Sequence, residues 1–310
     1  MSLLRSFTKN NTFVKLVEVG PRDGLQNEKT LLSTEQKAIY LRKLVNAGTK
    51  NLEFGAFVTS RVKQMQNSDK VLNFAGISTD VNYIALVPTP DYAKMAIKAG
   101  ATELAVITTV SEEFSKKNTN CTVEEGINRI SGITNLAKNH NIPVRGYISC
   151  IMGCPYEGYS EHYVDKTAYI SKKLIDLGCY EISLGDTTGI GDPVKTFNTL
   201  TEVKKLVPVE NLAVHFHNTY GRALANILVA LTYGVRIIDS SSGGLGGCPY
   251  AKGASGNVAT EDVIDLLNNM GIEHGINLEK LIKATNFIHS QLDKSPSSLV
   301  VQAYNKKIEE

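Results

Sequence analysis

The chain has 310 residues, of which 42% are hydrophobic. This length and composition allow a substantial buried core and exclude an intrinsically disordered protein. The 33 basic and 31 acidic residues leave a formal charge of +2, and no long run carries a single sign. We therefore expect neither a nucleic acid nor a membrane surface as partner. No segment approaches the roughly 18 apolar residues of a membrane span.

The five cysteines are odd in number and irregularly spaced, and no secretory signal precedes them. This pattern favours a reducing compartment. Cys150 and Cys154 are spaced like half of a structural zinc site, but no second pair at ligand spacing follows. A strand-like run begins already at Val14, so we expect no transit peptide and a location in the cytoplasm of a bacterium.

Short β-rich runs alternate with longer helical patterns, which predicts parallel strands joined by helices. A capping box at Ser33 and Gln36 and a left-handed stop at Gly48 delimit the first helix. The strands are expected at 13–20, 50–58, 81–87, 103–110, 143–150, 180–186, 211–218 and 235–242. Eight strand–helix units in about 250 to 300 residues predict an α/β fold, a closed (β/α)8 TIM barrel that forms one catalytic domain over residues 1–310.

A dinucleotide-binding open sheet is the alternative, and it normally has a glycine-rich phosphate turn after its first strand. Here that turn is GPRDGLQNE, whose glycines have the wrong spacing, and no Walker motif occurs. A glycine-rich stretch at 241–257 instead follows the last predicted strand, and a loop of this length is typically functional or mobile. Helices predicted at 260–271 and 277–292 would cap or extend the barrel, and the final residues are expected to be a partly ordered tail.

Two histidines at alternate positions of NLAVHFHN project to the same face of a strand, which suits a metal ion. A buried, hydrogen-bonded histidine is the simpler explanation of either one alone. In a (β/α)8 barrel the carboxyl ends of all strands meet at one mouth, so polar residues after different strands become neighbours. The polar residues at these positions are Arg22, Asp23, Glu53, Asp186, His215, His217, Cys248 and Asn257. Asp23 taken alone could be a turn residue, Asp186 a helix cap, and Asn257 a loop or cap residue. The eight polar residues taken together predict an active site.

Several of these segments are similar to one known family. GPRDGLQNE after the first strand, HFHN at the seventh and GGLGGCPYAKGASGNVATED after the eighth resemble the 3-hydroxy-3-methylglutaryl-CoA (HMG-CoA) lyase family. The resemblance runs from about Val14 to Asp262 and includes SCIMGCPYEGY and LGDTTGIG. The related isopropylmalate and homocitrate synthases share the arginine–aspartate pair and the paired histidines. They typically lack a cysteine in a GGCPYA-like loop, so this loop favours the lyases.

The resemblance implies a divalent cation, Mg²⁺ or Mn²⁺, a small-molecule CoA thioester substrate and a homodimer. The implied metal ligands are Asp23, His215, His217 and Asn257. This donor set agrees with the chemistry of the two ions, because they take about six mostly oxygen ligands and four protein groups leave two positions open. Two imidazoles suit Mn²⁺ slightly better than Mg²⁺, and ligand type alone leaves zinc open.

The resemblance also implies that Arg22 and Cys248 are catalytic, with Glu53 and Asp186 in support. Arg22 would bind the substrate at the thioester oxygen, where negative charge develops. Cys248 is either the thiol that protonates the enolate or a lid residue that excludes solvent, and the sequence leaves both roles open. The proton acceptor is equally open among Asp23, Glu53, Asp186 and a metal-bound water. Glu53 has the alternative role of an ion-pair partner that orients Arg22.

The predicted activity is cleavage of HMG-CoA into acetyl-CoA and acetoacetate, and three alternatives remain. The nearest is a synthase of the isopropylmalate or homocitrate type, which condenses a 2-oxo acid with acetyl-CoA and uses much the same metal and arginine. A noncatalytic metabolite-binding barrel would not need the complete ligand set. A Schiff-base aldolase needs a lysine at the mouth, and the predicted strand ends offer none.

Overall fold

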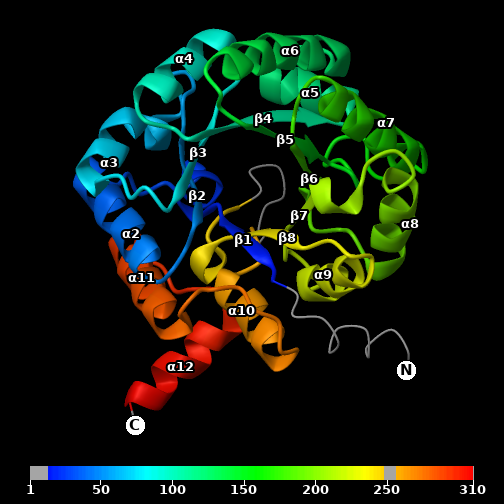
Figure 1. Cartoon of the computed structure of the whole chain (residues 1–310). Coiled ribbons are helices and arrows are strands. Elements are labelled where there is room, and N and C mark those ends of the chain that lie inside the picture. Colours follow the sequence, from blue (N-terminus) through cyan, green and yellow to red (C-terminus); the bar gives the residue numbers. More distant parts are fainter. Residues whose placement is uncertain (1–12, 248–255, 310) are drawn as a thin grey trace.

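Eight parallel strands form a closed barrel in the computed structural model, which describes residues 13–247 and 256–309 (Figure 1). The strands follow chain order around the barrel, and β1 closes the ring by pairing with β8. They are β1 (Lys15–Glu18), β2 (Asn51–Ala56), β3 (Asn82–Leu86), β4 (Glu103–Thr109), β5 (Val144–Ser149), β6 (Glu181–Asp186), β7 (Leu212–Phe216) and β8 (Ile237–Ser240). The predicted (β/α)8 barrel is confirmed, and each strand lies within the range expected from the sequence.

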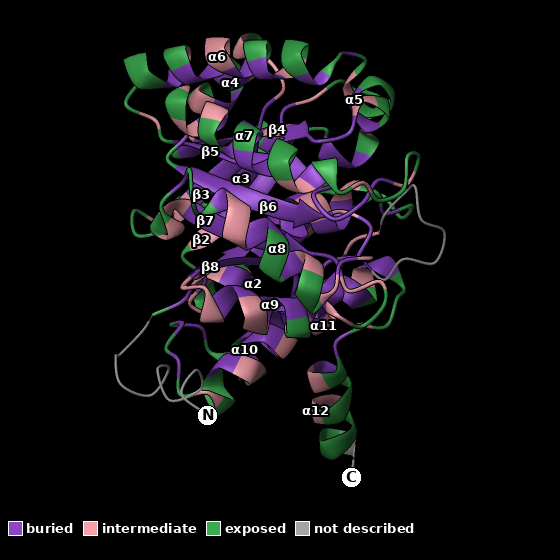
Figure 2. Cartoon of the chain, turned by 90° about the vertical axis from the view of Figure 1, so that its right-hand side faces the viewer, coloured by how far each residue is buried: buried purple, intermediate pink, exposed green. Residues whose placement is uncertain are grey.

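Helices surround the barrel and connect each strand to the next (Figure 1). They are α2 (Thr34–Asn46), α3 (Ser68–Ala75), α4 (Pro90–Lys98), α5 (Glu112–Thr119), α6 (Val123–Asn139), α7 (His162–Asp176), α8 (Pro193–Val203) and α9 (Ala223–Thr232). Short turns form η1 (Gly20–Gly24), η2 (Lys63–Met65), η3 (Val209–Asn211) and η4 (Ser242–Gly244). Buried residues fill the barrel, whereas exposed residues lie on the outer helix faces (Figure 2). Among the described residues, no helix has the length and apolar character needed to cross a membrane.

Local sequence signals set the limits of α2. The Ser33 side chain accepts a hydrogen bond from the N–H of Gln36 at 3.1 Å, and the Gln36 side chain accepts one from the N–H of Ser33 at 2.8 Å. These two bonds complete the predicted capping box. At the other end Gly48 has a φ of 101°, a left-handed conformation that glycine adopts without steric cost. Both predicted limits of the first helix are confirmed.

Three helices follow β8 in the part of the chain that the structure describes. The helices α10 (Thr260–Asn269) and α11 (Leu278–Leu292) match the predicted ones, and α11 packs along α2 (Figure 1). The expectation of a partly ordered tail is wrong, because α12 (Leu299–Glu309) is a regular helix that projects from the barrel (Figures 1 and 2). Ser298 explains its start: the hydroxyl accepts a hydrogen bond from the N–H of Val301 at 3.2 Å and donates to a carboxylate of α10 at 2.6 Å.

Candidate metal centre

The turn η1 after β1 positions the first two site residues. It is a single π-helical turn, a rare geometry that frequently occurs at functional sites. The turn requires glycine at Gly24, because an added Cβ would lie 2.9 Å from Leu245 Cβ in the loop after β8. This close approach brings Arg22 and Asp23 beside that loop at the carboxyl end of the barrel.

The paired histidines meet Asp23 from β7. His215 lies within β7 and His217 follows the strand directly, and their ring centroids are 5.4 Å apart. His215 Nε2 lies 3.7 Å from Asp23 Oδ2. One ligand atom from each of the three residues lies within 4.8 Å of the other two. In residues 13–247 and 256–309 no other histidine, cysteine or acidic residues form such a group, so Cys150 and Cys154 belong to none.

Asn257 reaches the same place from the far end of the glycine-rich loop. Its Nδ2 donates to Asp23 Oδ2 at 2.8 Å and to the carbonyl of Leu245 at 3.1 Å. Its backbone also forms an isolated bridge with His217. Gly246 permits this packing, because a Cβ there would lie 2.7 Å from Asn257 Nδ2. The four predicted ligands therefore lie together, and the Asn257 amide nitrogen faces Asp23.

The electrostatics of the cluster fit a divalent cation. Burial by itself would raise the pKa of Asp23, but the Arg22 guanidinium and the two histidines lower it below its ordinary value. Burial lowers the pKa of His217 to about 4. An ionised carboxylate and a neutral imidazole are the protonation states that metal ligation requires. His217 Nδ1 is also buried without a hydrogen-bond partner among the described residues, a need that a ligand would satisfy.

Arg22 lies between two carboxylates. Its Nε is 2.7 Å from Glu53 Oε2, and its Nη1 is 2.7 Å from Asp23 Oδ1. The side chains of Arg22 and Glu53 are 4% and 0% exposed, so this ion pair is inside the protein. Burial opposes the charge of Arg22, but the two carboxylates raise its pKa above the ordinary value. The Glu53–Arg22 contact has the geometry of the orienting role that the sequence left open.

Asp186 ends β6, but its carboxylate lies apart from the ligand cluster. Its Oδ2 accepts a hydrogen bond from the N–H of Gly191 at 2.9 Å, in the loop between β6 and α8, and burial raises the pKa of Asp186 to about 6. Strand alternation explains the placement: Ser183 faces the barrel interior, where it contacts Asp239, so Asp186 three positions later faces outward. Its link to the site is a backbone bond, in which the N–H of His217 donates to the Asp186 carbonyl at 3.3 Å.

Cys248 lies outside the described residues. The two described ends of its loop lie close together, because a Cβ on Gly256 would be 2.4 Å from the carbonyl group of Gly246. The carbonyl of Gly247 accepts a hydrogen bond from Asn27 Nδ2 at 3.4 Å, which links the loop to the segment after η1. The glycine-rich loop therefore begins and ends beside the predicted ligands.

Sequence reasoning missed two charged residues behind His215. Asp239 Oδ2 lies 3.3 Å from His215 Nδ1, and Arg145 Nη2 lies 2.9 Å from Asp239 Oδ1. Burial lowers the pKa of His215, but this carboxylate and that of Asp23 raise it above its ordinary value. Arg145 stands in PVRGYISC and Asp239 in VRIIDSSS, two predicted strands. A charged residue inside an otherwise buried strand is the signal that would have found them.

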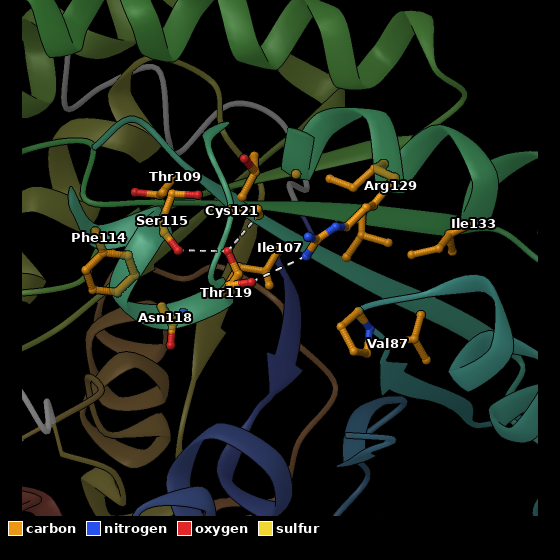
Figure 3. Close-up of a pocket in the computed structure, with 15 residues that line it drawn as sticks. Val87, Ile107, Thr109, Phe114, Ser115, Asn118, Thr119, Cys121, Arg129 and Ile133 are labelled. Atoms are coloured by element: carbon orange, nitrogen blue, oxygen red, sulfur yellow. Dashed lines mark hydrogen bonds between the residues drawn. The ribbon is translucent and has the colours of Figure 1, made fainter. Parts of the chain in front are cut away.

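A separate hollow lies outside the barrel, between β4 and the helices α5 and α6 (Figure 3). It encloses about 50 Å³, whereas pockets for small-molecule ligands measure roughly 300–1,000 Å³. The Arg129 guanidinium at this hollow donates to the carbonyl of Thr119 at 3.4 Å (Figure 3). The hollow shares no residue with the ligand cluster, and we assign it no part in substrate binding.

The sequence of this chain is similar to those of known proteins over most of its length. The HMGL-like family model matches residues 13–288. The cytoplasmic 3-hydroxy-3-methylglutaryl-CoA lyase of Rattus norvegicus is 49% identical over 292 residues, which cover 94% of this chain and 84% of that protein. The mitochondrial hydroxymethylglutaryl-CoA lyase of Mus musculus is 50% identical over 291 residues, which cover 94% of this chain and 89% of that protein.

Solved structures agree with this result. The hydroxymethylglutaryl-CoA lyase from Pseudomonas aeruginosa superposes with a TM-score of 0.93 at 43% identity and covers 96% of this chain and 98% of its own. An HMG-CoA lyase from Acinetobacter baumannii, in complex with coenzyme A and 3-methylmalate, has a TM-score of 0.88 at 32% identity and covers 94% and 95%. The chain therefore belongs to the HMGL-like family, as its motifs predicted.

Proposed function

We propose that this chain cleaves HMG-CoA into acetyl-CoA and acetoacetate in a metal-dependent reaction. The substrate hydroxyl gives its proton to water at the mouth, its carbon becomes the ketone of acetoacetate, and the adjacent carbon–carbon bond breaks. The electron pair of that bond remains on the thioester enolate, which then takes up a proton to give acetyl-CoA. The observation that carries the proposal is the juxtaposition of Asp23, His215 and His217 with Arg22 at the mouth. The identities of 49% and 50% to proteins named HMG-CoA lyases support the choice of substrate.

The residues that would hold the divalent cation are Asp23, His215 and His217. Asn257, already beside Asp23, would join them through its amide oxygen after a turn of the side chain. Bound at this centre, Mg²⁺ or Mn²⁺ supplies Lewis acidity that lowers the pKa of the substrate hydroxyl. A relative solved with coenzyme A bound supports a CoA thioester as the ligand of this mouth.

Arg22 would stabilise the charge that develops on the thioester oxygen. Glu53 and Asp23 engage its Nε and Nη1, and we assign the remaining terminal nitrogen, Nη2, to that oxygen. The carboxylates also fix the plane of the guanidinium before the substrate binds. A donor that is already oriented in a buried site stabilises developing charge without a reorganisation cost during the reaction.

The three carboxylates that the sequence offered as proton acceptors differ in their surroundings. Asp23 is a weak base, because Arg22 and the two histidines lower its pKa. Glu53 is committed to its ion pair with Arg22. Asp186 faces the N–H of Gly191, and we assign it to holding the β6–α8 loop.

Cys248 is proposed as the proton donor to the enolate. It follows Gly247 in a loop whose described ends lie at the ligand cluster. The test is a Cys248→Ser variant in deuterated buffer, which should lose most of its turnover, while each acetyl-CoA that it still forms should carry one deuterium. Near-normal turnover would assign the residue to solvent exclusion instead.

Two assays separate the proposed activity from its nearest rival. HMG-CoA supplied with Mn²⁺ should yield acetoacetate and acetyl-CoA in equal amounts. Acetyl-CoA supplied with 2-oxo acids should release no free thiol. The opposite pattern would identify a condensing synthase, and inactivity in both assays with bound metal would favour a noncatalytic binding protein.

The assembly and location of the chain are further parts of the proposal. We infer a homodimer, a cytoplasmic location and a single catalytic domain over residues 1–310. The similar proteins include both cytoplasmic and mitochondrial lyases. Light scattering coupled to size-exclusion chromatography would measure the mass, and cell fractionation would measure the location.

A further inference from the structure

Asp239 connects the ligand cluster to a chain of buried charges that runs through the barrel. At the far end Lys15 Nζ lies 2.8 Å from Glu181 Oε2. Arg145 Nη2 lies 2.8 Å from Glu181 Oε1 and 2.9 Å from Asp239 Oδ1. Asp239 Oδ2 in turn lies 3.3 Å from His215 Nδ1. The side chains of Glu181, Arg145 and Asp239 are each at most 1% exposed, so water does not loosen these contacts.

The surroundings of Asp239 leave its carboxylate little freedom. Ser183 Oγ donates to Oδ2 at 2.6 Å, and Arg145 donates from Nη2 to Oδ1 and from Nη1 to Oδ2 at 2.9 and 3.3 Å. The oxygens of the carboxylate are therefore fixed from β5 and β6 while Oδ2 faces His215 on β7. The Tyr147 ring packs edge-on against the imidazole, with ring centroids 5.8 Å apart, and restricts its rotation.

This contact decides which nitrogen of His215 carries the proton. An ionised carboxylate only accepts hydrogen bonds, so the nitrogen that faces Asp239, Nδ1, is the donor. In the neutral imidazole Nε2 then keeps its lone pair, and it is the nitrogen that lies 3.7 Å from Asp23 Oδ2.

We propose that Asp239 is a positioning residue, which holds His215 in the tautomer and orientation that present Nε2 to the cation. The inference deepens the proposed function, because it rests on the metal centre assigned above. Of the ligand residues Asp23, His215 and His217, Asp239 contacts His215, through Nδ1, so we expect it to act on the cation through His215. Carboxylates behind metal-binding histidines commonly have this effect, and their loss lowers metal affinity by about 10- to 100-fold.

The test is Mn²⁺ binding to the metal-free protein, followed by electron paramagnetic resonance without any substrate. Asp239→Asn should weaken Mn²⁺ binding by about 10- to 100-fold. The matched control is Glu181→Gln, which disturbs another buried carboxylate partner of Arg145 without touching His215. The control should lower stability but leave Mn²⁺ affinity within about threefold of wild type. An equal loss in both variants, or none in Asp239→Asn, would overturn the inference.

A double-mutant cycle and a wild-type measurement complete the test. In a His215→Gln background, Asp239→Asn should cause little further loss of Mn²⁺ affinity, because the residue through which it acts is absent. A full additional loss would refute the coupling. If Asp239→Asn does not fold, long-range ¹H–¹⁵N correlation spectra of the metal-free wild type, recorded at a pH at which His215 is neutral, still report the tautomer, and a proton on Nε2 rather than on Nδ1 of His215 would refute the inference. None of these readouts requires HMG-CoA cleavage, so failure of the proposed activity remains a separate result.

Discussion

Replacing Arg22 with methionine would separate its part in the reaction from its part in folding. Its guanidinium nitrogens lie 2.7 Å from oxygens of Glu53 and Asp23, and Glu53 is fully buried. Two charges with centres about 4 Å apart interact by about 4 kcal/mol at an effective dielectric constant of about 20. Removing one partner of a buried pair typically costs about 3 to 5 kcal/mol. We expect Arg22→Met to lower the free energy of unfolding by about 3 kcal/mol, because proton uptake by Glu53 limits the loss.

The same variant should raise the activation free energy of the reaction by about as much as it lowers the free energy of unfolding. Loss of one donor to a developing oxyanion typically slows an enzyme by about 100- to 1,000-fold. That range corresponds to about 3 to 4 kcal/mol of activation free energy. The assay is acetoacetate release from HMG-CoA at saturating Mn²⁺, and urea unfolding of the same preparation measures stability.

The control is the double variant Arg22→Met/Glu53→Gln. It removes the fully buried charge that Arg22→Met leaves on Glu53, while Asp23 keeps its hydrogen bond from Asn257, so the double variant should recover most of the lost unfolding free energy and none of the lost turnover. Turnover of Arg22→Met within about tenfold of wild type would refute a direct role of Arg22. Recovery of turnover in the double variant would show that Arg22 acts only through the fold.

Three other predictions test the centre, the turn and the buried acids. Removal of divalent cations with EDTA should abolish HMG-CoA cleavage and added Mn²⁺ should restore it, whereas full activity of a protein shown to be metal-free by elemental analysis would contradict the proposal. Gly24→Ala should lower the free energy of unfolding by about 1 to 3 kcal/mol, because its Cβ would lie 2.9 Å from Leu245 Cβ. The control is Gly126→Ala, at the fourth residue of α6, where the neighbouring atom nearest to an added Cβ would lie at 3.7 Å. It should stabilise by about 0.5 to 1 kcal/mol, and equal urea midpoints for the two variants would refute the argument. Burial raises the pKa of Glu261 from 4.5 to about 7, so the folded form holds this proton more tightly than the unfolded chain. The stability that this proton contributes is fully present below about pH 4.5 and is lost as the pH rises through about 7. Glu261→Gln should therefore reduce the decline of the unfolding free energy with pH, as measured by urea unfolding. An unchanged dependence of that free energy on pH would contradict the assignment.

Much of the fold was predictable because its signals are local. The capping box at Ser33 and the left-handed stop at Gly48 depend on residues within one turn of each other, and both were found where expected. The strands were located by short β-rich runs between helical patterns. The tail was misjudged for the same reason, since the start of α12 depends on a contact between Ser298 and a carboxylate of α10.

The sequence by itself determined the order of strands and helices, and with it the end of the barrel where polar residues gather. That rule placed Asp23 among several polar residues near the paired histidines, the family resemblance singled it out as their partner, and the structure places the three together. Only the tertiary structure decided that Asp186 faces outward and that Asp239 supports His215 from behind. The physical reason is that the direction in which a strand side chain points depends on the register of the strands and on the stagger of the barrel. A buried charge, moreover, is tolerated only where strands distant in the chain bring its partners within bonding distance.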